Sequence, residues 1–583
     1  MKKTLAWILA LALLFALGAA AEGRVTGQGV GQGIDGDVVV KVEADAATIY
    51  SVEVIEQNET PGIGSIAVEK LPGAIVEANS VAVDAIAGAT VTSNAIKDAV
   101  CEALAGGGID TAPFMTPPAV AEAKARTPET LECDVVIVGA GGAGLTAAVR
   151  AKQEGASVLV LEKMPMVGGN SLKASGGMNC AGTKFQAALD ITDSGVREFI
   201  EDTMNGGHYL NDLGLVATMA ANSSDAVDWL ESIGAPLPKV AATGGTVHKY
   251  LHSPEDGSPV GTYLIARLSE EAAKQGIDIM LNTTATEILM DGGAAVGVKA
   301  QDDAHDYTVN ARAVILATGG FGSNFDLMCS YKPSLANAVT TNHPGATGDG
   351  IMMAEAVGAA TVDMEQIQLH PTVYQETSML VSEKMRSLGS ILVNQEGKRF
   401  CNDLSTRDAV SAAELEQTGG YAYIVFDQNL VDQNKSAREY IEKGMAVQGD
   451  TYEALAEAMG VDAAAFAETM EKWNAAVAAG EDAEFGRNNG MDADLSVAPF
   501  YAIRIAPGIH HTMGGVKIDT ATRVIDTEGQ PIPGLFAAGE TTGGVHGGNR
   551  IGGNAVCDFV VFGRIAGENA AQYAAAAALE PAA

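Results

Sequence analysis

The sequence predicts an α/β protein, built around a parallel dinucleotide-binding sheet and preceded by a smaller α+β domain. Two observations predict the sheet: a buried strand that runs into the glycine-rich stretch 139–144, and an acidic residue, Glu162, that ends the next strand. The composition is a third observation, and it concerns the whole chain. Of the 583 residues, 47% are hydrophobic and only 19% are charged, and the 68 glycines are spread through apolar segments. This composition is typical of a folded chain, and the length allows three or four domains.

Residues 1–21 are predicted to form a secretory signal peptide. Lys2 and Lys3 precede an apolar stretch from Leu5 to Leu17, and small residues then lead to Glu22. Thirteen apolar residues fall short of the ~20 that span a bilayer, which disfavours the alternative of a membrane anchor. We expect an exported protein, in the periplasm or at the extracytoplasmic cell surface.

The charge balance excludes some partners. The formal net charge is −37, and a surface of that sign repels nucleic acid and anionic lipid headgroups. The six cysteines are scattered, without a Cys-x-x-Cys or Cys-x-x-Cys-His motif. That spacing excludes c-type haem attachment and zinc ribbons, so no metal site is predicted.

Residues 22–110 are predicted to form a small α+β domain. Strands are expected at Asp37–Val42 and Ile49–Ile55, and a helix at Ser93–Leu104. The stretch 84–93 places hydroxyl residues among small residues at the start of that helix, where backbone N–H groups favour an anion. By itself, the pattern is also that of a plain threonine N-cap.

A proline-rich linker is predicted at 111–131, and a dinucleotide-binding domain follows it. The strand Asp134–Val138 leads through Gly-x-Gly-x-x-Gly into a helix over Leu145–Gln153 and a strand over Ser157–Leu161. This order of strand, glycines, helix and acid makes the motif specific, because the glycines admit a pyrophosphate and Glu162 accepts ribose hydroxyls.

Later segments favour FAD over NAD. Strands are expected at 313–320 and 534–540, and the glycine-rich stretch 168–177 suits a loop that wraps a ring system. A second Gly-x-Gly-x-x-Gly motif is absent from the sequence, which disfavours direct use of a soluble nicotinamide.

Polar residues gather in four further stretches: 366–372, 382–386, 405–408, and the pair 510–515 with 546–555. Each has an ordinary explanation, such as a satisfied core histidine, an i, i+3 helix pair or a solvated loop pair. Glycines crowd around His510 and Arg550, however, and glycine brings backbone close to a ligand.

Residues 27–108 resemble the FMN-binding domain of sodium-pumping quinone reductase subunits and exported flavoproteins. The resemblance rests on the Glu-Thr-Pro-Gly turn at 59–62 and on an Asp-x-x-[Ser/Thr]-Gly-Ala-Thr signature ending at Thr90, with Ala87 in place of the usual hydroxyl residue. It implies that a flavin transferase attaches FMN covalently to Thr90 through a phosphoester, with Thr92 as the alternative acceptor.

Residues 131–574 resemble the soluble fumarate reductases and flavocytochromes of the succinate dehydrogenase flavoprotein superfamily. The His-Pro-Thr, Thr-Arg-Asp, His-His-Thr-Met-Gly-Gly and Asn-Arg-x-Gly-Gly-Asn-Ala blocks occur in the family's order. The resemblance implies a GR2-like two-part FAD domain, 132–370 and 506–583, with an α+β capping domain at 371–505. Together with the motifs, it predicts non-covalent FAD held by Gly139, Gly141, Ala143, Gly144, Glu162, Asn170, Ser171, Gly176, Gly177, Asp349, His511, Glu540, Ala555 and Val556.

The same resemblance implies roles around the substrate. His370 and Ser382 would hold one carboxylate, and His510 and Arg550 the other, with Gly553 also at the substrate. Arg407 would donate a proton, supplied by a relay through Glu383 and Arg386.

We therefore expect reduction of an α,β-unsaturated carboxylate, with fumarate the first choice and electrons entering at FMN from a membrane-linked donor. Ser387 and Leu388 depart from the family's usual Gly-x-Gly near the clamp, which keeps urocanate, methacrylate, acrylate and cinnamate open as substrates. Rival hypotheses are a flavin dehydrogenase or oxidase and a non-catalytic electron carrier.

Overall fold

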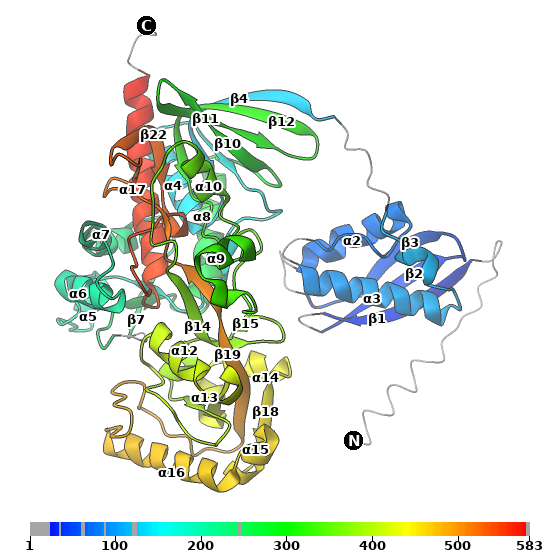
Figure 1. Cartoon of the computed structure of the whole chain (residues 1–583), viewed down its shortest axis with the longest axis vertical. Coiled ribbons are helices and arrows are strands. Elements are labelled where there is room, and N and C mark those ends of the chain that lie inside the picture. Colours follow the sequence, from blue (N-terminus) through cyan, green and yellow to red (C-terminus); the bar gives the residue numbers. More distant parts are fainter. Residues whose placement is uncertain are drawn as a thin grey trace. The chain divides into compact units, whose positions relative to one another are not determined.

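The computed structural model describes residues 24–578, apart from 34–35, 60–63, 87–88, 119–124, 243 and 245. The predicted signal peptide therefore lies outside the described residues. The chain divides into two compact units, Met1–Ala123 and Lys124–Ala583 (Figure 1).

The smaller unit is a three-stranded antiparallel sheet with two helices packed on it. The sheet has the order β1-β2-β3, and α3 contacts β1 and β2 while α2 contacts β3. The bounds are β1 Val25–Gln32, β2 Asp37–Ala44, β3 Ile49–Glu56, α2 Gly64–Ala78 and α3 Thr90–Gly106. The two strands and the helix predicted here are confirmed, and the described residues add β1 and α2.

Strand β1 was missed because it is rich in glycine, which is uncommon in strands. The structure explains this composition. A Cβ atom at Gly27 or Gly29 would lie 2.2 or 2.0 Å from a backbone oxygen of α3. The glycines therefore let the strand approach the helix more closely than any side chain would permit.

The larger unit contains an eight-stranded sheet with the order β10-β11-β12-β4-β5-β9, in which β22 pairs with β12 and β21. Strands β12, β4, β5 and β9 run parallel, as does β22 beside β12. Helices α4 and α17 pack on each other along this sheet. The bounds are β4 Thr127–Val138, α4 Gly142–Gln153, β5 Val158–Leu161, β9 Asp278–Met280, β10 Thr284–Asp291, β11 Ala294–Gln301, β12 His305–Leu316, β21 Arg523–Ile525, β22 Pro531–Ala537 and α17 Asn554–Ala577.

The predicted linker is too long at its C-terminal end. Strand β4 begins at Thr127, where it pairs in parallel with His305 of β12. Residues 127–130 are exposed, so they lack the apolar pattern by which a buried strand is recognised.

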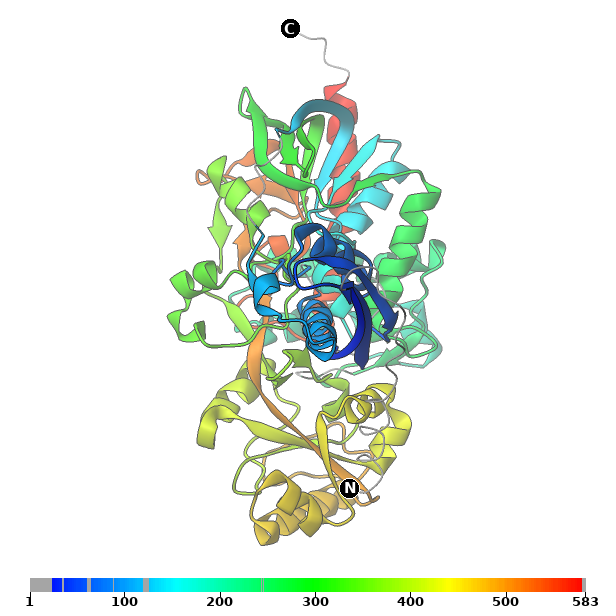
Figure 2. The ribbon, with the colours of Figure 1, turned by 90° about the vertical axis from the view of Figure 1, so that its right-hand side faces the viewer.

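A second sheet has the order β15-β14-β19-β17-β16, with β18 also paired to β19. Strand β19, Phe500–Thr512, pairs with β17 through its first half and with β14 through its second. Figures 1 and 2 show this long strand running from the yellow segments toward the first sheet. The other bounds are β14 Ile367–Tyr374, β15 Met379–Leu380, β16 Ile391–Val393, β17 Ala422–Asp427, β18 Ala446–Gly449, α11 Lys384–Ser387, α12 Arg407–Leu415, α13 Gln428–Gln433, α14 Lys435–Glu442, α15 Tyr452–Met459 and α16 Ala463–Ala479.

Short strands and helices complete the larger unit. These are β6 Met178–Asn179, β7 Lys239–Ala241, β8 Leu251–Ser253, β13 Thr361–Val362, β20 Gly515–Val516, α5 Lys184–Ala188, α6 Val196–Gly206, α7 Leu213–Ser232, α8 Val260–Lys274, α9 Phe325–Tyr331 and α10 Asp349–Ala356. Among the described residues, no helix combines the length and the apolar character needed to cross a membrane.

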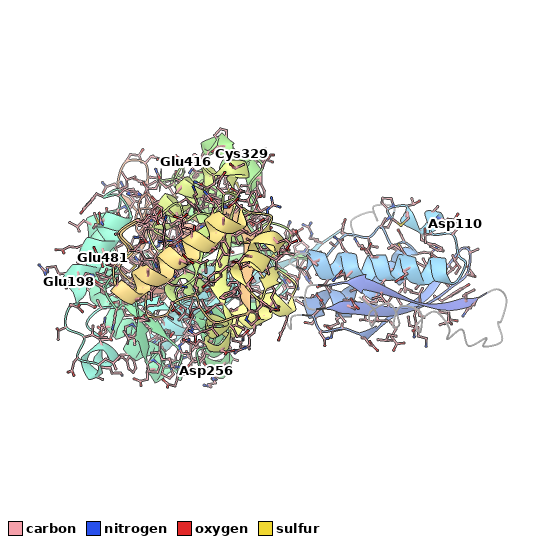
Figure 3. The ribbon with its side chains drawn as sticks, turned by 90° about the horizontal axis from the view of Figure 1, so that it is seen from below. Asp110, Glu198, Asp256, Cys329, Glu416 and Glu481 are labelled. Atoms are coloured by element: carbon pink, nitrogen blue, oxygen red, sulfur yellow. The ribbon has the colours of Figure 1, made fainter. Side chains whose placement is uncertain are left out.

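The acidic surplus lies largely on the surface. Asp256, Glu416 and Glu481 are exposed, and Figure 3 shows them at the periphery of the larger unit. The charge of −37 is therefore compatible with interiors that are mainly hydrophobic.

Candidate active site

A cavity of about 1160 Å³ opens in the larger unit, where strands β4, β5 and β12 end. Ligands of open α/β sheets bind at this carboxyl edge. The cavity is lined by twenty of the predicted site residues: Gly139, Gly141, Ala143, Glu162, Asn170, Ser171, Gly176, Gly177, Asp349, His370, Ser382, Glu383, Arg407, His510, His511, Glu540, Arg550, Gly553, Ala555 and Val556. Gly144 and Arg386 are not in its wall.

The glycines of the turn between β4 and α4 have different structural roles. Gly139 has φ +104°, and a Cβ atom at Gly144 would lie 1.9 Å from the Gly139 carbonyl oxygen. Glycine at position 144 therefore lets the helix approach the strand closely, because a side chain there would collide with the turn. At Gly141 an added Cβ atom would meet only one atom, at 3.8 Å, so this residue leaves room in the cavity.

Glu162 is held rigidly at the end of β5. Its Oε2 accepts a hydrogen bond of 2.8 Å from the backbone N–H of Ala140, and its Oε1 accepts one of 2.8 Å from that of Met164. Burial raises the pKa of this carboxyl group. A carboxylate has about four acceptor positions, so capacity remains for ribose hydroxyls.

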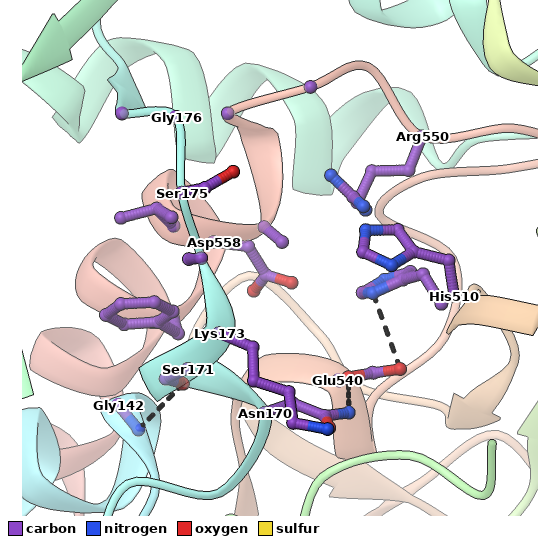
Figure 4. A pocket seen from close by; sticks show the side chains of 18 of the residues that line it. Gly142, Asn170, Ser171, Lys173, Ser175, Gly176, His510, Glu540, Arg550 and Asp558 are labelled. Carbon is purple, nitrogen blue, oxygen red and sulfur yellow. Dashed lines mark hydrogen bonds and ion pairs between the residues drawn. The ribbon is translucent and has the colours of Figure 1, made fainter. Parts of the chain in front are cut away.

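The loop 168–177 forms one side of the cavity, and Figure 4 shows His510 and Arg550 across from it. Asn170 Nδ2 donates to Glu540 Oε2 at 3.2 Å, and Ser171 Oγ accepts from the Gly142 backbone N–H at 3.0 Å. At Gly176 an added Cβ atom would meet nothing within 4 Å. The loop thus presents open backbone toward the cavity.

These features fit a flavin dinucleotide. Backbone N–H groups at the start of α4 and α17 suit a pyrophosphate, because helix N-termini attract anions. The open glycines leave space for a ring system, and the cavity is larger than the 300–1,000 Å³ of common small-molecule sites. Within the described residues, no group of three His, Cys, Asp or Glu side chains could hold a metal ion.

An acid in the cavity wall, with 13% of its side chain exposed, joins two arginines. Glu383 Oε2 lies 2.8 Å from Arg407 Nη2, and Glu383 Oε1 lies 3.1 Å from Arg386 Nη2. Burial alone would raise the pKa of Glu383, but Arg407 and Arg386 outweigh it and lower that pKa to about 2. The carboxylate is therefore ionised, with Arg407 in the cavity wall and Arg386 fully buried behind it.

Two histidines face each other at the same end of the cavity. The rings of His370 and His510 lie 5.0 Å apart between centroids, at 67°. The backbone N–H of Thr372 donates to His370 Nδ1 at 3.2 Å, which leaves the proton of the neutral ring on Nε2. Among the described residues Nε2 has no hydrogen-bond partner, so His370 can donate to a substrate oxygen.

Burial sets the charges of this end of the cavity. Burial and the nearby Arg407 lower the pKa values of His370 and His510 well below the usual value. The same two causes lower the pKa of Arg550 to about 9. At neutral pH the histidines are therefore neutral donors, while Arg550 remains cationic.

Sequence reasoning missed Gln368, although it lies within a stretch that drew attention. Its Oε1 accepts hydrogen bonds of 3.2 Å from both Arg407 Nη1 and Arg550 Nη2. The Gln368 side chain thus bridges two positively charged guanidinium groups by accepting a hydrogen bond from each. Its position two residues before His370 on β14 was the available signal.

Lys173 was also missed as a cavity residue. Its Nζ donates to the carbonyl oxygens of Thr341 and Asn342 at 2.9 and 3.1 Å, and burial lowers its pKa to about 8. It is a cation in the loop that lines the cavity (Figure 4).

In the smaller unit, Thr90 is the first residue of α3. Its side chain and residues 87–88 lie outside what the structure describes. Thr92 is fully buried, and its hydroxyl donates to Glu59.

Comparison with known proteins agrees with this geometry. Residues 134–556 match the family model of the FAD binding domain, and residues 33–105 match that of the FMN-binding domain. A solved structure, the open conformation of a flavocytochrome c3 fumarate reductase, superposes with a TM-score of 0.65 at 44% identity, covering 76% of this chain and 79% of that one. The chain belongs to the fumarate reductase family of FAD-dependent flavoproteins.

Two curated relatives extend the match into the FMN-binding domain. The NADH:fumarate oxidoreductase of Klebsiella pneumoniae (strain 342) is 44% identical over 542 residues, which are 93% of this chain but 56% of the relative. The urocanate reductase of Eggerthella lenta is 35% identical over 575 residues, covering 96% of this chain and 94% of the relative. This flavoprotein is thus an FAD-dependent oxidoreductase of the fumarate reductase family with an N-terminal FMN-binding domain.

Proposed function

We propose that this flavoprotein reduces an α,β-unsaturated carboxylate, with fumarate as the substrate and succinate as the product. One observation carries the proposal: His370, His510, Arg550 and Arg407 line the same end of one cavity, and Glu383 holds Arg407 in place. Reduction of a dicarboxylate requires groups that bind its two carboxylates and one group that donates a proton.

The chain's own residues bind and polarise the substrate. His370 and Ser382 hold one carboxylate, and His510 and Arg550 hold the other. Negative charge develops on the carboxylate side during reduction, so donors fixed there stabilise the transition state more than the ground state. When bound, FAD supplies the hydride that adds to the β-carbon.

Arg407 gives a proton to the α-carbon. Its guanidinium is fixed by Glu383 at 2.8 Å and by Gln368 at 3.2 Å, so it meets the substrate in one orientation. Glu383 and Arg386 then return a proton to Arg407. Residues 371–505 are proposed to act as the capping domain of a GR2-like fold and to exclude water from these groups.

FMN would be the entry point for electrons from a membrane-linked donor. We propose that a flavin transferase attaches it to Thr90, since the alternative, Thr92, is fully buried with its hydroxyl bonded to Glu59. Export through residues 1–21 fits a covalent flavin, because a dissociated cofactor would be lost outside the cell.

The substrate is tested by anaerobic oxidation of reduced methyl viologen with fumarate, urocanate, methacrylate, acrylate and cinnamate in parallel. Fast turnover of fumarate alone supports the two-carboxylate site. Urocanate is a specific second candidate, because a relative that matches over nearly the full length of both chains is a urocanate reductase. Preference for urocanate or a monocarboxylate would show that Ser387 and Leu388, which line the cavity, have changed the substrate.

A further inference from the structure

A buried histidine and aspartate, His546 and Asp558, form a pair that takes no part in binding the substrate. His546 Nε2 lies 3.0 Å from Asp558 Oδ2, and the two side chains are only 3% and 2% exposed. Asp558 follows Val556 by two positions on α17, and both residues line the cavity of about 1160 Å³. Figure 4 shows the Asp558 side chain among the residues of that wall. One member of the pair therefore belongs to the site that fits the flavin.

The Asp558 carboxylate has little compensation for its charge. Its Oδ2 contacts His546, but its Oδ1 is buried and has no hydrogen-bond partner among the described residues. Buried polar groups are nearly always paired, so an exception calls for an explanation. The other buried or half-buried acids of the cavity wall each have at least two partners, and these acids are Glu162, Asp349, Glu383 and Glu540.

His546 holds this carboxylate without neutralising it. Its ring packs edge-on against His511, with 5.3 Å between the centroids, and His511 lines the cavity. The Nδ1 atom of His546 is buried and has no hydrogen-bond partner in the described part of the chain. A charged ring would bury an unpaired N–H donor there together with its charge, so the contacts favour a neutral ring that donates from Nε2. In that state the pair carries one negative charge.

The charge of Asp558 acts on other groups beside the cavity. Burial lowers the pKa of Arg550, and Asp558 is one of the acids that oppose this effect. Burial, followed by Asp558, raises the pKa of the neighbouring Cys557 thiol. Charges interact strongly in buried surroundings, where water screens them little. A flavin ring in the same cavity is therefore exposed to the same field.

A charge of the opposite sign lines the cavity in the loop 168–177. Lys173 Nζ donates to two backbone carbonyl oxygens, at 2.9 and 3.1 Å. Burial lowers its pKa to about 8, so most of it is charged at pH 7. This cation provides a comparison for Asp558, because its effect on a flavin should have the reverse sign.

We propose that Asp558, held by His546, sets the reduction potential of the bound FAD. Two-electron reduction adds negative charge to a flavin ring, and charge placed near the ring is one means by which a protein tunes it. A fixed negative charge in the cavity wall disfavours the reduced state and so lowers the potential. The reduced cofactor is then a stronger hydride donor. This property belongs to the cofactor site and does not depend on which unsaturated acid is reduced.

The test is a spectroelectrochemical titration of the full, FAD-loaded chain that compares D558N with D228N. D228N makes the same change at a side chain that is 52% exposed. In D558N the ratio of the affinities for reduced and oxidised FAD should rise about ten-fold, which raises the two-electron potential by about 30 mV. K173Q removes the opposite charge and should lower the potential of the same couple. The couple of FMN, which belongs to the smaller unit, should stay unchanged in each variant.

D558S removes the same charge with a smaller side chain and replaces D558N if that variant does not retain FAD. An FAD couple in D558N and D558S equal to that in D228N would overturn the inference. A shift of D558N and K173Q in the same direction would also overturn it, because the cause would then be a change of structure and not of charge. Loss of FAD from both Asp558 variants would show that the carboxylate is required for binding, which contradicts a role in tuning. None of these titrations uses a substrate, so a wild-type enzyme that reduces none of the five acids would overturn the proposed function alone.

Discussion

Oε2 of Glu383 lies 2.8 Å from Nη2 of Arg407, inside the wall of the 1160 Å³ cavity. The other oxygen of the same carboxylate is bonded to Arg386, which is fully buried. One carboxylate therefore connects an arginine in the cavity wall with an arginine that is fully buried outside that wall. The arrangement suits a proton donor that must be refilled without opening the cavity.

Replacing Arg407 tests its role as proton donor. R407A should retain FAD and lose turnover by about a thousand-fold, which is within the range for removal of a general acid. The measurement is steady-state fumarate reduction together with the flavin absorbance of the purified protein. R197A is the control, because that arginine side chain is 78% exposed. Near-normal turnover in R407A would remove Arg407 from the mechanism.

Replacing Glu383 tests the buried ion pairs. E383Q should lower the free energy of unfolding at pH 7 by about 3 kcal/mol, because two buried guanidinium groups lose their counter-ion. The pKa of Glu383 is lowered from 4.5 to about 2, so its stabilisation is present above pH 4.5 and is lost as the pH falls toward 2. Denaturant unfolding of both proteins should therefore show a difference that narrows from pH 5 to pH 2. A difference independent of pH would contradict this account.

Substrate affinity should depend on pH through Arg550. Its pKa is lowered to about 9, so the guanidinium is charged below pH 9 and loses its attraction for a carboxylate above it. KM for the preferred substrate should rise above pH 9, while no step near pH 6.5 is expected, because His370 and His510 are already neutral there. A KM that rises between pH 6 and pH 7 would show that a charged histidine binds the substrate.

Replacing Thr90 tests the flavin attachment. T90A, produced with the flavin transferase, should give no fluorescent band on a denaturing gel, whereas T90S should keep one. T92S is the comparison, since it preserves the hydroxyl that is bonded to Glu59. Fluorescence that persists in T90A and disappears in T92V would move the link to Thr92.

Substrate choice should respond to Leu388. L388A removes bulk from the cavity wall and should raise turnover of urocanate or cinnamate relative to fumarate by about ten-fold, which is a common effect of a few methylene groups in a pocket. L213A is the control, as that side chain is exposed at 58%. An unchanged ratio of kcat/KM values would place the substrate away from Leu388.

Local patterns were enough to predict much of the dinucleotide-binding sheet. Strand β4, helix α4 and strand β5 follow one another within 35 residues, and their signals are the buried apolar runs and the glycine spacing between them. The predicted strands 313–320 and 534–540 overlap β12 and β22 only at their last four residues, where the burial is continuous and the residues form an apolar run.

Features made by contacts across the chain could not be predicted in this way. Gln368 accepts hydrogen bonds from Arg407 and Arg550, which lie 39 and 182 positions away in the sequence. The residues next to Gln368 in the sequence do not indicate either partner. The contact between His546 and Asp558, at 3.0 Å, could not be predicted either, because His546 lies in a glycine-rich segment and Asp558 on a helix. Strand β1 was missed for another reason. Its glycines allow the close approach of α3, but glycine is uncommon in strands and weakens the sequence pattern of a strand.

Strand β19 begins at Phe500 among one set of packed side chains and reaches His510 beside another. The end of the cavity at which His510 lies is therefore connected through one strand to three hydrophobic clusters. Side chains of all three clusters belong to the one continuous strand that carries His510. A comparison confined to the residues that line the cavity would therefore leave out many of the side chains that pack around the strand carrying His510.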